Sequence, residues 1–248
     1  MQQVARVPAL LVILLLPWGN AESRAQKTDA VRGQRPHFCA TSHHDSFDRG
    51  GLAFLYCGSP SGMAFSLESA HASARPVFYG AVPVAWGGAI LVQDPSFTAA
   101  AYRLSVSQGL TYGLVLGAKH VVGRPRPYVN LPLEARTKRN RPPDPAEAHL
   151  SFPSGHAGVS AALATSWSLS YPRWYVIAPG AVWATGVALS RVYLGVHYPS
   201  DVLMGAALGV GVALLVHQLR TIVTPPPFRG PTGSQRVRGI PVTLRLQF

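Results

Sequence analysis

Five long stretches of this 248-residue chain are almost free of charged side chains and are rich in Ala, Gly, Val and Leu. A helix needs about 20 such residues, at about 1.5 Å each, to cross a hydrocarbon core of about 30 Å. The stretches are Pro76–Val92, Phe97–Lys119, His156–Tyr171, Trp174–Leu194 and Ser200–Leu219. The first and third are short, which leaves the number of crossings open. The pattern predicts an all-α fold, a polytopic membrane bundle of about five transmembrane helices.

The composition agrees with a membrane setting and indicates a phosphate-bearing partner. Charged residues make up 13% of the chain, against about 25% in an average soluble domain. A net charge of +12 arises from 22 Lys and Arg against 10 Asp and Glu, which favours nucleic acid, an anionic lipid surface or a phosphorylated substrate. The arginines form no single basic helix and no nucleic-acid motif is present, so we expect no nucleic-acid partner. A membrane and a phosphorylated lipid are the predicted partners, and the sequence leaves the oligomeric state open.

Residues 1–21 have the pattern of a secretory signal peptide. Arg6 precedes an apolar run, Ala9–Leu16, that is too short to span a bilayer comfortably. Ala21 and Ala25 are both possible cleavage ends, and an uncleaved anchor is the alternative. Export would place the segment that follows outside the cytoplasm.

Residues 22–75 are polar and turn-rich, and we expect an irregular extracytoplasmic segment with one short buried piece at Leu52–Tyr56. In an exported protein Cys39 and Cys57 can pair, and the alternative is two idle thiols. A sharper alternative is a metal site built from His37, Cys39, His43, His44 and Cys57. That set matches no usual Cys/His spacing, and we predict no metal site.

Proline steps separate the apolar stretches, at Asp94-Pro95, Tyr171-Pro172-Arg173 and Tyr198-Pro199. The long connection 121–153 is polar and basic. A loop of that length inside a compact domain is usually functional or disordered. Here the residues at the two ends of the connection are of types that can bind anions or transfer protons.

Three short clusters lie at the ends of apolar helices. They are Lys119-His-Val-Val-Gly-Arg-Pro-Arg126-Pro127, Pro153-Ser154-Gly155-His156, and Ser190-Arg191-Val-Tyr-Leu-Gly-Val-His197-Tyr-Pro-Ser-Asp201. Because consecutive membrane helices alternate in direction, all three clusters are expected at one membrane face. Each cluster alone has an ordinary reading, such as a snorkelling arginine or a helix start. Their joint occurrence is not explained by chance.

The clusters combine an anion site with acid–base and nucleophilic groups. Lys119, Arg126 and Arg191 would repel one another unless an anion lies between them. Ser154 and Gly155 open a helix, whose first N–H groups point into the same space.

Two histidines complete the predicted site. The spacing of His197 and Asp201 lets the carboxylate take the Nδ1 hydrogen and leaves Nε2 free as a nucleophile. His156, at a helix start, can give a proton to a leaving oxygen.

With these residues, the sequence resembles the type 2 phosphatidic acid phosphatase superfamily. Its signature is Lys-x6-Arg-Pro, Pro-Ser-Gly-His and Ser-Arg-x5-His-x3-Asp, and every signature position is matched here. The resemblance runs from about Arg75 to Arg220, so we assign residues 76–220 to a catalytic domain and 221–248 to a basic tail. It implies an all-helical fold and an enzyme with no cofactor or metal requirement.

The resemblance also implies a role for each signature residue. Phosphate oxygens would be bound by Lys119, Arg126, Arg191, the Ser154 hydroxyl and the amides of Gly155 and His156. His197 would become phosphorylated while Asp201 orients it. His156 would protonate the leaving alcohol and later activate water.

The apolar stretches favour the membrane lipid phosphatase branch of this superfamily, acting on a lipid phosphate or pyrophosphate. Candidate substrates are polyprenyl pyrophosphate, phosphatidic acid, phosphatidylglycerophosphate and the phosphates of a lipopolysaccharide lipid anchor. The alternatives are a soluble exported acid phosphatase and a catalytically silent scaffold of the same fold. A haloperoxidase would need a larger chain and a pocket for an oxidant.

The predicted signal peptide sets the predicted topology, with the active site facing the periplasm or exterior of a bacterial-type cell membrane. The tail would then be cytoplasmic, and its basic residues suit the positive-inside rule. They are Arg229, Arg236, Arg238 and Arg245. The alternation of apolar residues over 240–248 is typical of an edge strand or an interfacial segment.

Overall fold

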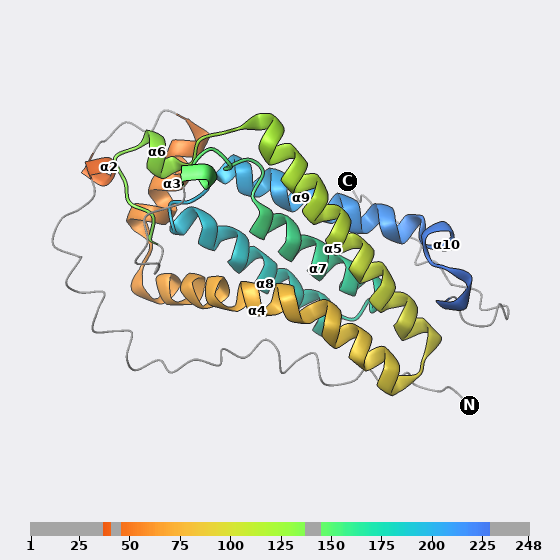
Figure 1. Ribbon diagram of the computed structural model, residues 1–248. Helices are drawn as coiled ribbons and strands as arrows, with labels where there is room; N and C mark the ends of the chain where they lie inside the picture. Colours follow the sequence, from red (N-terminus) through yellow and green to blue (C-terminus); the bar gives the residue numbers. More distant parts are fainter. Residues whose placement is uncertain (1–36, 41–45, 137–144, 229–248) are drawn as a thin grey trace, which may run out of the picture.

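The computed structural model describes residues 37–40, 46–136 and 145–228, and every regular element in them is helical (Figure 1). The helices are α2 His37–Ala40, α3 Phe47–Gly58, α4 Ser61–Val92, α5 Pro95–Val122, α6 Pro127–Asn130, α7 Gly155–Ser170, α8 Trp174–Tyr193, α9 Pro199–Gln218 and α10 Arg220–Val223. Two short 3₁₀ turns, η2 Pro145–Glu147 and η3 Pro226–Phe228, complete the order. The predicted signal peptide and the alternating segment 240–248 lie outside the described residues.

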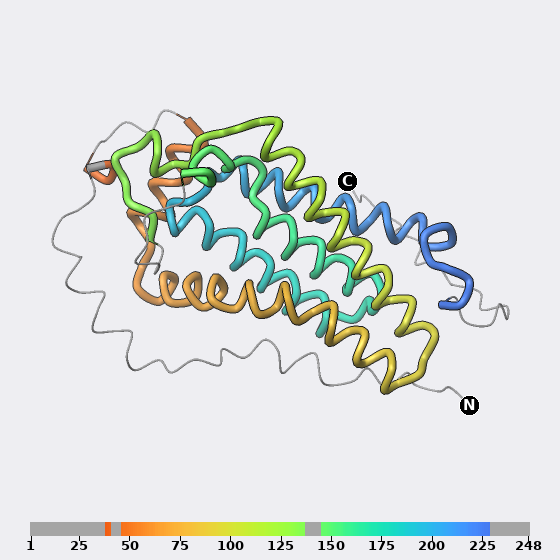
Figure 2. The backbone as a smooth tube through the Cα atoms, in the orientation of Figure 1, coloured from red at the N-terminus to blue at the C-terminus, as the bar shows by residue number. Residues whose placement is uncertain are grey.

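The five predicted apolar stretches correspond to α4, α5, α7, α8 and α9, which form one bundle. The shortest, α7, packs against each of the other four (Figures 1 and 2). It is lined with small buried residues, including Ala157, Ser160 and Ala162, which allow close neighbours on several sides. The all-α prediction is confirmed.

Local chemistry places the breaks between the helices. Asp94 caps α5 by accepting a hydrogen bond from the Ser96 amide at 2.9 Å, and Pro95 takes the first helical position. Gln93 ends α4 in the left-handed region, at φ 52°. The predicted breaks at Pro172 and Pro199 are also confirmed, since α8 begins at Trp174 and α9 at Pro199.

The predicted irregular structure up to Arg75 is wrong for residues 46–75. Helix α3 occupies 47–58 and contains the predicted buried piece, while α4 begins at Ser61 and continues through Pro76 and Pro83. Packing overrides the polar composition, because Leu67 and Ala74 of α4 are buried in the bundle. The uncharged part of α4 therefore starts about where predicted, but a polar extension precedes it.

Helices α7 and α9 approach each other unusually closely. A Cβ atom on Gly205 would lie 2.3 Å from the Ser154 carbonyl oxygen, and one on Gly209 would lie 2.0 Å from the Gly158 oxygen. Only glycine permits this approach, and the pair has the four-residue spacing of membrane helix interfaces. The contact holds the start of α7 against the start of α9.

The outer face of the bundle is apolar. In the described part of the chain, α4, α8 and α9 are long and apolar enough to cross a membrane. Exposed apolar side chains on these helices include Ile90, Val182 and Leu214, and aromatic Trp174 and Tyr175 begin α8, as at a membrane interface. The count of about five crossings stays a prediction.

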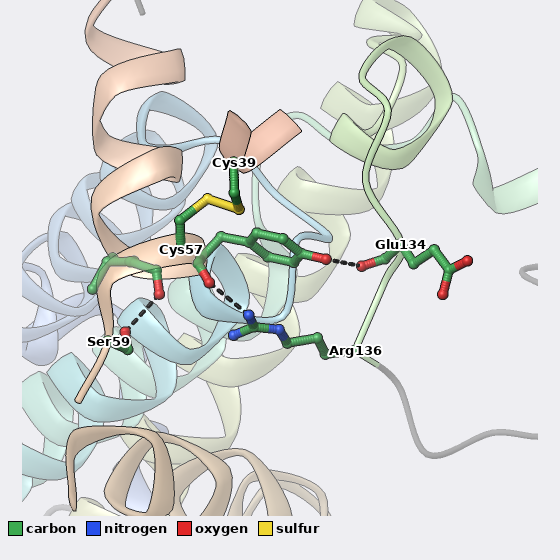
Figure 3. Close-up of a disulfide and its surroundings, with 7 residues drawn as sticks. Cys39, Cys57, Ser59, Glu134 and Arg136 are labelled. Atoms are coloured by element: carbon green, nitrogen blue, oxygen red, sulfur yellow. Dashed lines mark hydrogen bonds between the residues drawn. A yellow bond between two sulfur atoms is a disulfide. The ribbon is translucent and has the colours of Figure 1, made fainter. Parts of the chain in front are cut away.

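Helices α2 and α3 cover one end of the bundle and are joined by a disulfide between Cys39 and Cys57 (Figure 3). The Tyr56 hydroxyl donates to the Glu134 carbonyl oxygen at 2.9 Å, and Arg136 donates to the Tyr56 carbonyl oxygen at 2.6 Å. The disulfide excludes both cysteines as thiolate ligands, which removes the metal-site alternative. Of its histidines, His43 and His44 lie outside the described residues.

Candidate active site

All three sequence clusters meet at the end of the bundle that α3 covers. The Ser154 amide donates to the Asp201 carbonyl oxygen at 2.9 Å, joining the starts of α7 and α9. A Cβ atom on Gly155 would lie 4.0 Å from Cε of Lys119, at the end of α5. The Lys119 ammonium donates to the Leu150 carbonyl oxygen. The three clusters therefore converge at this end of the bundle, as predicted.

The three predicted phosphate-binding cations surround His197. Arg191 is buried, with 6% of its surface exposed, and its Nη1 lies 2.9 Å from Nδ1 of His71 on α4. Arg126 has one acidic neighbour, with Nη2 at 3.6 Å from Oε2 of Glu147. Like charges gathered in a poorly solvated site repel one another strongly. The arrangement suits a multiply charged anion.

Four buried polar atoms near these cations have no hydrogen-bond partner among the described residues. They are Ser154 Oγ, His156 Nε2, Arg126 Nε and Arg191 Nε. Ser154 is the N-cap residue of α7, yet its side chain makes no capping bond. Buried polar atoms normally have partners, and the oxygens of a phosphate group would supply them here.

His197 is buried, with 3% of its surface exposed, and its Nδ1 faces Asp201. The distance from Nδ1 to Asp201 Oδ2 is 3.7 Å, which is too long for a hydrogen bond. Ser151 lies between them, with its Oγ 2.5 Å from Asp201 Oδ2 and 3.4 Å from His197 Nδ1. The predicted direct hydrogen bond is thus replaced by this three-residue arrangement.

The surroundings keep His197 neutral. Burial, and then the charges of Arg191, Arg126 and Lys119, lower its pKa to about 3, although Asp201 opposes the shift. A neutral imidazole whose Nδ1 faces a carboxylate presents Nε2 as an unprotonated nitrogen. That is the form a nucleophile requires.

His156 lies against helix α4. Its ring centroid is 5.5 Å from that of Phe78 and 6.4 Å from that of His71. Both α4 residues were absent from the sequence prediction, because their segment was expected to be irregular or simply membrane-spanning. Nε2 of His156, which has no hydrogen-bond partner among the described residues, can exchange a proton with a bound group.

Sequence reasoning also missed Arg124, Ser151 and Asp48. Arg124 donates to Asp201 Oδ1 at 2.5 Å and to Asp48 Oδ2 at 2.7 Å. The available signal was sequence position, because Arg124 lies inside the first cluster and Ser151 lies two residues before the second. Asp48 had no such signal, since in the sequence it lies 76 residues from Arg124 and 152 residues from Ser200.

Within the described residues, no group of three or more His, Cys, Asp or Glu side chains is placed to hold a metal ion. The three cations gather positive charge of the kind that could stabilise the negative charge developed in a phosphoryl transfer. Metal independence stays a prediction.

Several characterised lipid phosphatases are similar to this chain over part of its length. Decaprenylphosphoryl-5-phosphoribose phosphatase of Mycobacterium tuberculosis is 43% identical over 88 residues, which is 32% of this chain and 46% of the relative. Undecaprenyl-diphosphatase of Sulfolobus acidocaldarius is 38% identical over 78 residues, 32% of this chain and 37% of the relative. Lipid A 1-phosphatase of Rhizobium johnstonii is 41% identical over 69 residues, 27% of each chain. The chain thus matches less than half the length of these relatives.

Two solved structures share the fold. LpxE of Aquifex aeolicus superposes with a TM-score of 0.58 at 17% identity, covering 72% of this chain and 99% of that one. The transmembrane PAP2-type phosphatidylglycerolphosphate phosphatase of Bacillus subtilis gives a TM-score of 0.54 at 20% identity, covering 75% and 91%. Residues 100–224, half of the chain, match the PAP2 superfamily and include every residue of the three clusters. The chain belongs to the PAP2 superfamily.

Proposed function

We propose that this protein removes phosphate from a membrane lipid phosphate or pyrophosphate through a phosphohistidine intermediate on His197. The observation that carries the proposal is the convergence of Lys119, Arg126 and Arg191, with the unpartnered Ser154 hydroxyl, on that buried neutral imidazole. The relatives whose names specify a lipid phosphate or diphosphate support the same class of reaction.

In the first step, Nε2 of His197 attacks the phosphorus atom and the bond to the leaving oxygen breaks. Ser151 and Asp201 hold the Nδ1 side of the ring, and the three cations neutralise charge on the phosphoryl oxygens. The bound phosphate anion offsets the positive charges around His156 and favours its protonated form, and this imidazolium donates its proton to the leaving alcohol or phosphate.

In the second step, the now neutral His156 takes a proton from water, and the resulting hydroxide attacks the phosphohistidine. The N–P bond breaks, its electrons return to His197, and inorganic phosphate leaves. His156 ends protonated, as it began, so no metal ion or redox partner is consumed.

A lipid is the favoured substrate because the site lies at the end of apolar helices. Exposed apolar side chains on α4, α8 and α9 give the bundle a lipid-facing surface. A phosphate held between the cations would have its lipid tail directed along that surface. The candidates remain polyprenyl pyrophosphate, phosphatidic acid, phosphatidylglycerophosphate and the phosphates of a lipopolysaccharide lipid anchor.

We also propose that the site faces the periplasm or the exterior of a bacterial-type cell membrane. The disulfide between Cys39 and Cys57 lies at the same end of the bundle as the clusters. Disulfides persist in oxidising compartments and are rare in the cytosol. The predicted signal peptide supports the same orientation.

The test is phosphate release by detergent-purified protein in the presence of EDTA. The substrates are a polyprenyl pyrophosphate, phosphatidic acid, phosphatidylglycerophosphate and a water-soluble aryl phosphate. We expect release from a lipid, loss of turnover in His197→Ala, and normal turnover in His120→Ala, whose imidazole is exposed on α5.

Four other outcomes would change the assignment. Activity on the aryl phosphate alone would favour the soluble-substrate acid phosphatase. No activity on any substrate would favour the silent scaffold. Undiminished turnover in His197→Ala would overturn the nucleophile, and lower turnover with EDTA than in a parallel reaction without it would overturn metal independence.

A further inference from the structure

We infer that Asp48 and Arg124 are positioning residues that hold Asp201 toward His197, so that helix α3 completes the catalytic machinery. Asp48 lies outside the residues that match the superfamily, and neither residue belongs to the three-part signature. The inference rests on the proposed function, because it assigns Asp201 to the orientation of a nucleophilic His197.

Asp201 is fully buried. Its Oδ2 accepts hydrogen bonds from Ser151 Oγ at 2.5 Å and from the Tyr198 amide at 2.9 Å. Its Oδ1 accepts from Arg124 Nη1 at 2.5 Å. Among the described residues, Arg124 is the cationic side chain that donates a hydrogen bond to this carboxylate. The buried negative charge of Asp201 therefore depends on the Arg124 guanidinium.

Arg124 bridges the carboxylates of Asp201 and Asp48. Nη1 contacts Asp201 Oδ1 and donates to Ser200 Oγ at 2.7 Å, while Nη2 donates to Asp48 Oδ2 at 2.7 Å. The guanidinium also lies over the Tyr198 ring, 4.3 Å from its centroid. A planar fork of donors suits such bridging, which a lysine cannot reproduce fully.

These contacts separate Arg124 from the phosphate-binding cations. Arg126 and Arg191 have buried Nε atoms without partners, whereas both terminal nitrogens of Arg124 are already engaged by carboxylates. Burial lowers the pKa of Arg124, but the hydrogen bond to Asp48 and the charges of Asp201 and Asp48 outweigh it and raise that pKa. Arg124 therefore serves the carboxylate and not the substrate.

Asp48 lies in the first turn of α3. Its Oδ1 accepts from the Ser200 amide at 2.9 Å, and its Oδ2 accepts from Ser200 Oγ at 2.8 Å. Asp48 thus also caps the first turn of α9, on which Asp201 lies. One carboxylate fixes both the helix that carries Asp201 and the arginine that binds it.

The position of α3 makes this contact possible. Gly51 lies so close to the start of α9 that a Cβ atom there would be 2.8 Å from Pro199 Cγ. Leu52, Leu55 and Tyr56 of α3 are buried in a cluster with residues of α8 and α9. Helix α3 is therefore a packed part of the bundle end, and the disulfide ties it to α2.

The test compares Asp48→Asn, Arg124→Gln and Arg124→Lys with the control Arg49→Gln, an exposed neighbour on α3. The substrate is whichever of polyprenyl pyrophosphate, phosphatidic acid and phosphatidylglycerophosphate the wild type hydrolyses fastest. Loss of a partner that orients a catalytic group typically costs about 10- to 100-fold. We expect that loss in kcat for Arg124→Gln, a smaller loss for Asp48→Asn, partial recovery in Arg124→Lys and none in the control.

Two further measurements separate positioning from a merely structural role. The KM and the competitive inhibition constant of inorganic phosphate should change less than about threefold, because the phosphate-binding cations are intact. Adding Asp48→Asn to Arg124→Gln should lower kcat by less than Asp48→Asn does alone, since both act through Asp201.

The outcomes distinguish this inference from the proposed function. An inactive wild type would overturn the proposed function. An active wild type with normal kcat in both Asp48→Asn and Arg124→Gln would overturn the inference alone, as would parallel losses in kcat and phosphate affinity. If Arg124→Gln fails to fold, the nearly isosteric Asp48→Asn decides the question.

Discussion

At the residue scale, Asp201 is a buried carboxylate that must be stabilised by hydrogen bonds and oriented toward His197. It receives hydrogen bonds from Ser151, Tyr198 and Arg124 while facing His197. We predict that Asp201→Asn lowers kcat by about 100-fold or more, because an amide cannot stabilise the imidazole in the same tautomer and charge state. KM should change little. Steady-state kinetics on the lipid substrate measure both, and equal losses in kcat and in phosphate affinity would indicate a folding role instead.

The pKa of His197 has a consequence for stability. Burial lowers this pKa from 6.5 to about 3, so below pH 6.5 the unfolded chain binds a proton that the native state does not. The stabilisation that depends on neutral His197 is therefore fully present above pH 6.5 and is lost as the pH falls toward 3. Lowering the pH from 6.5 to about 4.5 should reduce the free energy of unfolding by about 2 to 3 kcal/mol through this group. Thermal unfolding in detergent should show a steeper acid decline for wild type than for His197→Gln, and identical declines would contradict the assignment.

The residues proposed to bind phosphate and to attack it were predictable from sequence, and those proposed to hold them in place were not. Lys119, Arg126, Arg191 and His197 belong to short motifs whose chemistry is local. The contact between Asp48 and Arg124 depends on how α3 packs over the bundle end, which no local spacing encodes. Ser151 adjoins a motif, but its position between His197 and Asp201 depends on the path of the loop.

At the element scale, the apolar stretches predicted the bundle, and polar composition concealed the first half of α4. Glu68, His71 and Arg75 read as loop residues in isolation, yet they occupy a helix that lines the active-site end. Propensity is a weak guide where tertiary packing decides. The breaks at Pro95, Pro172 and Pro199 were predictable because proline and its preceding residue restrict the backbone directly.

The contact between α7 and α9 gives a prediction at the same scale. A methyl group at Gly205 meets the Ser154 carbonyl oxygen, whereas one at Gly211 on the same helix meets nothing within 4 Å. Overpacking typically costs about 1 to 3 kcal/mol. We expect Gly205→Ala to lower the thermal midpoint and the activity, and Gly211→Ala to leave both near wild type. If Gly205→Ala kept the thermal midpoint and activity of Gly211→Ala, the close contact between α7 and α9 would not be needed for stability or activity.

The disulfide between Cys39 and Cys57 also leads to a testable expectation, because it ties α3 to α2. Closing the 18-residue separation between Cys39 and Cys57 is worth about 3 kcal/mol of stability in the chain-entropy view. Reduction should loosen α3 and lower kcat more than it raises KM, since α3 carries Asp48. Kinetics with and without dithiothreitol measure this effect. The Cys39→Ser, Cys57→Ser double variant should start at the lower kcat and be insensitive to dithiothreitol, and a sensitive double variant would refute the link.

At the scale of the whole molecule, the two ends of the bundle are chemically different. One end combines the disulfide, helix α3 and the cation cluster, whereas the opposite end presents the α4–α5 and α7–α8 turns and the aromatic start of α8 (Figure 1). A membrane crossing between them requires that each end faces a different compartment. The disulfide and the predicted signal peptide both support our proposal that this end lies on the extracytoplasmic side.

Cysteine labelling tests this orientation directly. Asn130 is exposed near the active-site end and Arg173 is exposed at the other, and both native cysteines are engaged in the disulfide. In bacterial spheroplasts, a membrane-impermeant maleimide should label Asn130→Cys at once and Arg173→Cys only after permeabilisation. The reverse pattern would place the phosphate-binding cations in the cytoplasm. Labelling of both variants in intact spheroplasts would mean that the bundle does not separate two compartments, which would contradict the membrane-spanning topology itself.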